Sequence, residues 1–75
     1  MEIVKVYQDA EHANRAEIER HTNKKAYIDD TATHVLYRVV FYADYDHSFI
    51  YHVVCFETLS EAEKHISEYP FFKEV

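Results

Sequence analysis

The sequence predicts an α+β domain, a small antiparallel sheet with two helices on one face, in the β-α-β-β-α-β order of ferredoxin-like domains. Two runs rich in β-branched and aromatic residues, 34–43 and 48–56, flank a short polar segment, as expected for a hairpin. A helix signature follows at 58–69. Seventy-five residues are enough for one such domain, 1–75, with a small core.

In the first half of the chain, the β-branched run Glu2–Tyr7 predicts a strand. Asp9 is a suitable N-cap, and residues 10–22 lack Gly and Pro, so we expect a helix there, although its apolar stripe is thin. Residues 24–30 form either a brief strand or an irregular link. If they form a strand, the alternative fold is a three-stranded antiparallel meander flanked by two helices.

In the second half, Thr58 and Glu61 have the spacing of a capping box at the start of the second helix. The apolar residues of this helix form one narrow stripe, Leu59, Ala62, Ile66 and Tyr69. Pro70 ends the helix. Residues 71–75, with Phe71, Phe72 and Val75, then form a closing strand or a docked tail.

Composition excludes several function classes. The chain has no glycine, and phosphate-binding loops need glycine for close backbone approach. The net charge is −6. Residues 44–75 contain seven acids and two bases, a net of −5, which leaves −1 for residues 1–43. Because binding to a phosphate backbone relies on Lys and Arg, this charge favours a basic partner protein over nucleic acid or an anionic membrane.

The hairpin is apolar on both of its expected faces, yet two helices would cover only one. We expect the uncovered face to form an interface, with Val40, Tyr42, Phe49, Tyr51 and Val53 as its contact residues. A homodimer through this face is the simplest arrangement. The alternatives are that residues 24–30 or the C-terminal segment cover the face, or that it is kept for a different protein.

No catalytic, cofactor-binding or metal-binding residues are predicted. The six histidines lack the spacing of metal ligands, and a cation at the hairpin tip (Asp44, Asp46, His47) is left open. Cys55 lies in an apolar run, where a lone cysteine is expected to be buried. Since the sequence has no leader-like or membrane-spanning apolar stretch, we expect a cytoplasmic location.

These features together predict a small, acidic, non-enzymatic protein-binding module, with no cofactor. One concrete form is an inhibitor of the kind phages and plasmids encode, acting on a basic, nucleic-acid-binding protein. Its acidic residues would steer the partner; they are Asp44, Asp46, Glu57, Glu61, Glu63 and Glu68. The alternatives are a single-stranded nucleic-acid-binding domain that uses an aromatic sheet face, and a structural homodimer or accessory subunit.

Overall fold

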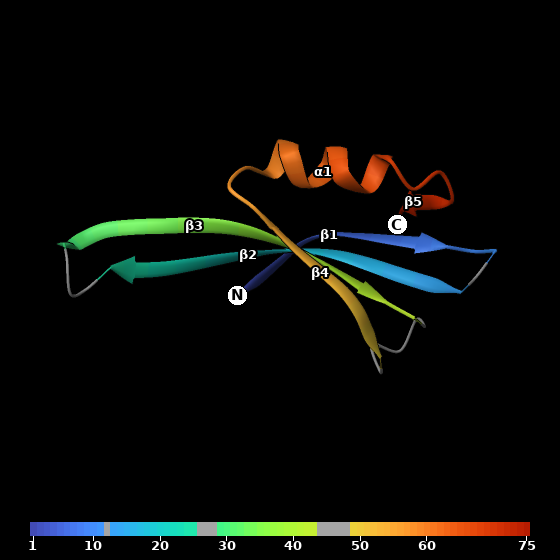
Figure 1. Cartoon of the computed structure of the whole chain (residues 1–75), viewed down its shortest axis with the longest axis horizontal. Helices are drawn as coiled ribbons and strands as arrows, with labels where there is room; N and C mark the ends of the chain where they lie inside the picture. The colour runs from blue at the N-terminus through green and yellow to red at the C-terminus, as the bar shows by residue number, and fades with distance from the viewer. Residues whose placement is uncertain (12, 26–28, 44–48) are drawn as a thin grey trace.

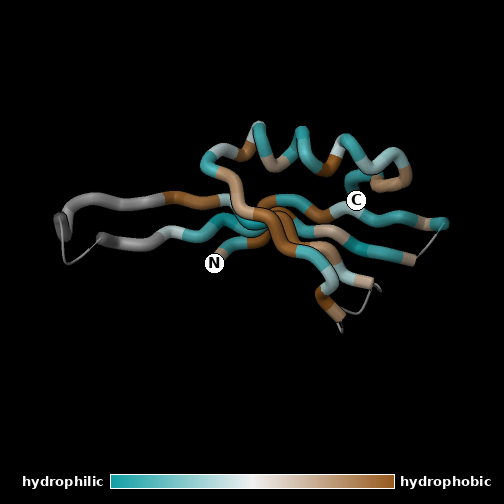
Figure 2. The backbone as a smooth tube through the Cα atoms, in the orientation of Figure 1, coloured by the Kyte–Doolittle hydropathy of each residue, from teal (hydrophilic) through white to brown (hydrophobic). Residues whose placement is uncertain are grey.

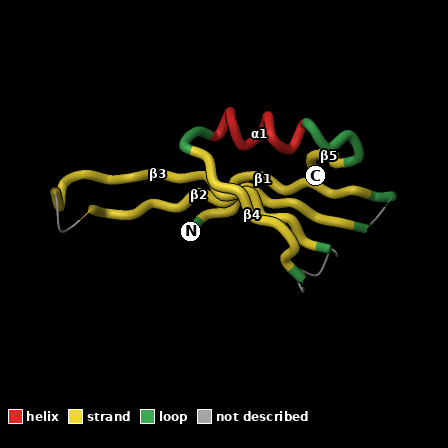
Figure 3. The backbone as a smooth tube through the Cα atoms, viewed as in Figure 1, coloured by secondary structure: helices red, strands yellow, loops and turns green. Residues whose placement is uncertain are grey.

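A computed structural model describes residues 1–11, 13–25, 29–43 and 49–75. These residues form five antiparallel strands in one sheet and one short helix (Figures 1 and 3). The elements are β1 (Glu2–Asp9), β2 (Asn14–Lys25), β3 (Asp29–Tyr42), β4 (Ile50–Phe56), α1 (Leu59–Ser67) and β5 (Phe72–Glu74). The strand order in the sheet is β4-β3-β2-β1-β5. The α+β class is therefore right, but the ferredoxin-like arrangement with two helices is wrong, and so is the alternative of a three-stranded meander flanked by two helices.

The predicted first helix is wrong because the chain at 14–25 is a strand, β2, which pairs with both β1 and β3. Ala16 and Ile18 are fully buried under α1, while Glu17 and Glu19 alternate with them on the other face. Residues of high helix propensity thus form a strand, because tertiary pairing overrides a weak local preference.

Asp9 makes the kind of hydrogen bond expected of a cap, but in a turn. Its Oδ1 atom accepts from the backbone N–H of Glu11 at 3.0 Å, a contact that can start a turn as readily as a helix. Ala13, just before β2, has a positive φ of 56°. An alanine costs about 1 kcal/mol in this conformation, so β1 reverses into β2 without a glycine.

The second helix is confirmed. The backbone N–H of Glu61 donates to Thr58 Oγ1 at 3.2 Å, and the Thr58 hydroxyl donates to Glu61 Oε1 at 2.9 Å. Ala62 and Ile66 are buried against the sheet. After Pro70 the chain enters β5, which pairs with β1, so the closing strand is the correct one of the two alternatives for the C-terminus.

The hydrophobic core lies between α1 and one face of the sheet (Figure 1). Phe41 is its centre: the ring is fully buried and lies 5.0 Å from the ring of Tyr69 and 5.7 Å from that of Phe72. Burial of the core residues is what holds the helix to the sheet. They are Tyr7, Ala16, Ile18, Val39, Phe41, Ala62 and Ile66.

The β2–β3 pair extends well beyond the rest of the sheet. β1 pairs with β2 only as far as Arg20, and β4 pairs with β3 only from Tyr37. Residues 21–25 and 29–36 therefore pair only with each other within the described sheet. They form the two-stranded arm at the left of Figure 1, and the molecule measures 46 × 24 × 18 Å. The undecided segment 24–30 thus contributes strand residues on either side of residues 26–28.

Candidate protein-binding edge

The hairpin is confirmed as β3 paired with β4, but its ladder contains an irregularity that changes which side chains share a face. Phe41 faces His52 and Tyr42 faces Ile50, so Tyr51 is an extra residue between two pairs. A bulge of this kind redirects the side chain of the extra residue. The Tyr51 ring lies 6.0 Å from the ring of Phe41. Tyr51 is therefore on the side that α1 covers, and the predicted alternation of Phe49, Tyr51 and Val53 is wrong.

Burial raises the pKa of the Tyr51 hydroxyl above its ordinary value of 10.0, and the nearby Tyr69 and Asp9 raise it further. The residue is still 47% exposed. The side chain thus lies at the rim of the core, with one side packed and the other open to solvent.

The face of the sheet opposite α1, called here the open face, is not the apolar surface that the alternation predicted. Val40 is fully buried between Glu17 on β2 and Val53 on β4. Tyr42 is also buried, and burial raises the pKa of its hydroxyl, with Glu17 and Glu19 adding to the effect. The expectation that Val40 and Tyr42 are exposed contact residues is wrong.

Paired charges occupy the middle of the open face. Arg15 Nε donates to Glu17 Oε2 at 2.7 Å. Glu19 Oε1 accepts from Arg38 Nη2 at 3.1 Å and contacts His21 Nε2 at 2.8 Å. Both glutamates are almost fully buried. Such groups are tolerated in a protein interior when each is paired and hydrogen-bonded. The buried carboxylates of the open face therefore find their partners within the sheet itself.

Four of the ten large apolar residues that are exposed in the described part of the chain lie on or next to β4, an edge strand of the sheet, and the others are spread over the N-terminus, β1, β3 and the C-terminal segment. We call these four the β4 edge patch: Phe49, Ile50, Tyr51 and Val53, which are 61%, 51%, 47% and 42% exposed. β4 contains no Asp, Glu, Lys or Arg, and it includes the apolar run near the strand crossing in Figure 2. An exposed edge strand of this kind presents unpaired backbone groups to another chain.

Cys55 also lies on β4 and is exposed, so the expectation that it is buried is wrong. It faces Arg38 across the β3–β4 ladder. The apolar run around it indicated burial, but the edge position of the strand leaves this side chain in solvent. Sequence reasoning also omitted Ile50, whose exposure follows from its position next to the bulge.

The acidic candidates are dispersed. Glu57, Glu61 and Glu68 are exposed on and around α1. Glu63 Oε2 instead binds Lys5 Nζ at 2.6 Å, which raises the pKa of the Lys5 amine. Asp44 and Asp46 lie outside the described residues, as does the hairpin tip, so a cation site there is not addressed. The described part of the chain contains no cluster of three or more metal-ligating side chains.

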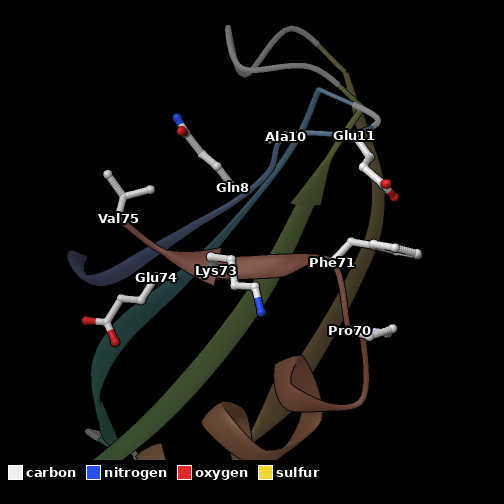
Figure 4. Close-up of a pocket in the computed structure, with 8 residues that line it drawn as sticks. All are labelled: Gln8, Ala10, Glu11, Pro70, Phe71, Lys73, Glu74 and Val75. Atoms are coloured by element: carbon white, nitrogen blue, oxygen red, sulfur yellow. The ribbon is translucent and has the colours of Figure 1, made fainter.

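An open hollow of about 590 Å³ lies beside β5 (Figure 4). Phe71 and Val75 give it an apolar wall. The charged groups of Glu11, Lys73 and Glu74 point apart there and do not converge on one point (Figure 4). A small-molecule site needs a few convergent polar groups, so this hollow gives no catalytic or ligand-binding arrangement.

Comparison with known proteins identifies no relative, because no family model, no curated protein and no solved structure matches the chain. Among the described residues, no helix is long and apolar enough to cross a membrane. The β4 edge patch, an exposed apolar edge strand, is the candidate site.

Proposed function

We propose that this chain is a non-enzymatic protein-binding module whose apolar contact is the β4 edge patch. The observation that carries the proposal is an exposed edge strand that is mostly apolar and contains no Asp, Glu, Lys or Arg. Binding by strand addition uses backbone hydrogen bonds for affinity and the alternate side chains for specificity. Exposed Phe and Tyr side chains are also favoured at protein interfaces.

The charge of the chain supports a basic partner. Glu57 follows directly on β4 and is exposed, as is Glu68 at the other end of α1. With a net charge of −6, long-range attraction would raise the association rate of a basic protein more than its affinity. A small cytoplasmic inhibitor of a basic, nucleic-acid-binding protein is the concrete form of this proposal.

The open face favours a protein partner over single-stranded nucleic acid. Base stacking needs exposed aromatic side chains on a positively charged surface. On this face the central aromatic residue, Tyr42, is buried, and the cations Arg15 and Arg38 are paired with Glu17 and Glu19. The described residues of this face thus offer no basic aromatic platform.

A quantitative affinity capture from native host lysate tests the proposal. The wild-type chain, Val53→Lys and Val75→Lys would be immobilised in parallel. Val75 is exposed at the far end of the sheet, beside β5, so Val75→Lys controls for the added charge. We expect a basic protein to be retained by the wild type and by Val75→Lys but lost with Val53→Lys. Equal recovery on all three surfaces would contradict a binding role for β4.

The steering role of the acidic residues has its own readout. Glu57→Gln combined with Glu68→Gln should lower the association rate for the captured protein while the dissociation rate stays nearly constant. The difference should shrink as salt is added, because exposed charges are screened. A salt-independent association rate in the wild-type chain would contradict electrostatic steering.

A further inference from the structure

We infer that the occupant of the β4 edge patch is a second copy of this chain, paired antiparallel to β4 across a two-fold axis near Val53. This inference rests on the proposed role of the β4 edge patch as a protein contact and assigns that contact to a second copy. A basic protein would then bind the dimer through the acidic residues around α1 and would depend on β4 only through the dimer. The product would be a continuous sheet in which the two β4 strands are the central pair.

The two edges of the sheet differ in a way that supports this pairing. β5 is three residues long and carries Lys73 and Glu74. Short length and charged side chains are the usual protection of an edge strand against pairing. β4 is seven residues long, has no Pro, Lys, Asp or Glu, and is mostly exposed. One edge is therefore protected and the other is left open.

The bulge does not block the open edge. It lies at Tyr51, near the start of β4, and the ladder with β3 is regular from His52 to Phe56. This regular part can receive a strand on its outer side. In Figure 1 the beginning of β4 also lies away from α1.

A strand without charges is compatible with itself. In antiparallel pairing about Val53, Val53 faces the second copy's valine, and His52 faces the second copy's Val54, which is on the same face of the sheet. No like charges meet directly within the strand, whereas opposed like charges would destabilise the pair. A two-fold interface uses the same patch on both copies, which an apolar β-branched strand supplies without any complementary surface.

The exposed area is adequate for such an interface. Aromatic side chains such as those of Phe49 and Tyr51 have about 150–250 Å² each, and these two and the smaller Ile50 and Val53 are each about half exposed. Pairing would cover roughly 400 Å² of side chain per copy plus backbone, close to the ~1,000 Å² total that a specific interface needs. The acidic residues around α1 remain outside this contact and stay available to a basic partner.

The test is the mass in solution, by light scattering over about a hundredfold dilution. We expect the wild type and Val75→Lys to approach twice 9.0 kDa at high concentration. Val53→Lys should weaken the dimer by more than about a hundredfold, because two ammonium groups would meet at the axis. A wild type that stays monomeric throughout, or a dimer unaffected by Val53→Lys, would overturn the inference.

A charge-swap pair removes the ambiguity of a misfolded variant. Val53→Lys and Val53→Glu should each be folded by circular dichroism and monomeric by light scattering, and mixing them should restore the dimer. Folded variants that stay monomeric on mixing would refute pairing about Val53. If the wild type is monomeric and Val53→Lys still loses a captured basic protein, the proposed function survives and the second copy does not. If neither assay responds to Val53→Lys, both fail.

Discussion

The charge network on the open face makes a prediction about stability that does not depend on any partner. The Glu19 side chain is 5% exposed, and Arg38 donates to it through Nε at 3.2 Å and Nη2 at 3.1 Å. At an effective dielectric constant of about 20, two unit charges at this separation attract by roughly 5 kcal/mol. Because Arg38 is 41% exposed, solvent screens much of this, and we expect about 1–3 kcal/mol to be lost in Arg38→Met.

That loss would be a large part of the total. A chain of this length has an unfolding free energy of about 4–11 kcal/mol. Urea denaturation at neutral pH would compare the wild type, Arg38→Met, Glu19→Leu and the double variant. We expect Arg38→Met to be less stable than the double variant, because the single change leaves a buried carboxylate short of a partner while the double change removes both charges.

Arg20→Met is the matched control. Arg20 pairs with Glu2, and both side chains are exposed, so its loss should cost no more than about 0.5 kcal/mol. If Arg38→Met is as harmless as Arg20→Met, Glu19 is not shielded from water. The account of the open face as an internally satisfied surface would then be refuted.

Three further predictions concern the core, the helix and alkaline pH. Phe41→Ala should lower the free energy of unfolding by about 3–5 kcal/mol, since the ring is fully buried among other rings. A loss of less than about 1 kcal/mol in guanidinium denaturation would contradict this. Thr58→Ala should lower the free energy of unfolding by about 1 kcal/mol through loss of the cap. Thr58→Ser keeps a capping hydroxyl, so in thermal denaturation it should keep most of the wild-type stability. Stability should fall as the pH rises above about 10, because a group with a raised pKa stabilises the fold below its unfolded pKa and loses this effect as pH passes its folded pKa. The groups with a raised pKa are Lys5, Tyr7, Tyr42 and Tyr51. Absorbance titration of the folded chain should show some tyrosines that ionise later than the others, and tyrosines that all ionise together would contradict the prediction.

Some of this structure could be predicted because local and tertiary preferences agree. The 34–43 and 48–56 runs have β-branched residues and a polar break between them, and they form β3 and β4. The capping box at Thr58 and the stripe containing Ala62 and Ile66 specify α1. In each case the residues that favour the element are also those that the core buries, so sequence reasoning has two consistent signals.

The strand β2 is where these preferences conflict. Residues 14–20 are rich in Ala, Glu and Arg, which favours a helix. The same residues alternate, with Ala16 and Ile18 between Arg15, Glu17 and Glu19, and this period of two is the signal of a strand with one buried face. Propensity favoured the wrong element, and the alternation would have identified the right one. The burial of Glu17 and Glu19 could not be read from either signal, because it depends on the ion pairs made across the sheet.

The same details move the candidate site from a face to an edge. Strict alternation placed Tyr42, Tyr51 and Val53 on an uncovered apolar face, as if a partner would lie flat against the sheet. The bulge turns Tyr51 toward Phe41, and Tyr42 is buried beside the charged pairs. A flat partner would have to cover Glu19 and Arg38, whose charges are already satisfied, and would gain little from desolvating them. A strand added to β4 covers Ile50 and Val53 and pairs backbone groups without disturbing that network. Binding along the edge is therefore the arrangement in which added contacts do not compete with those that hold the sheet together.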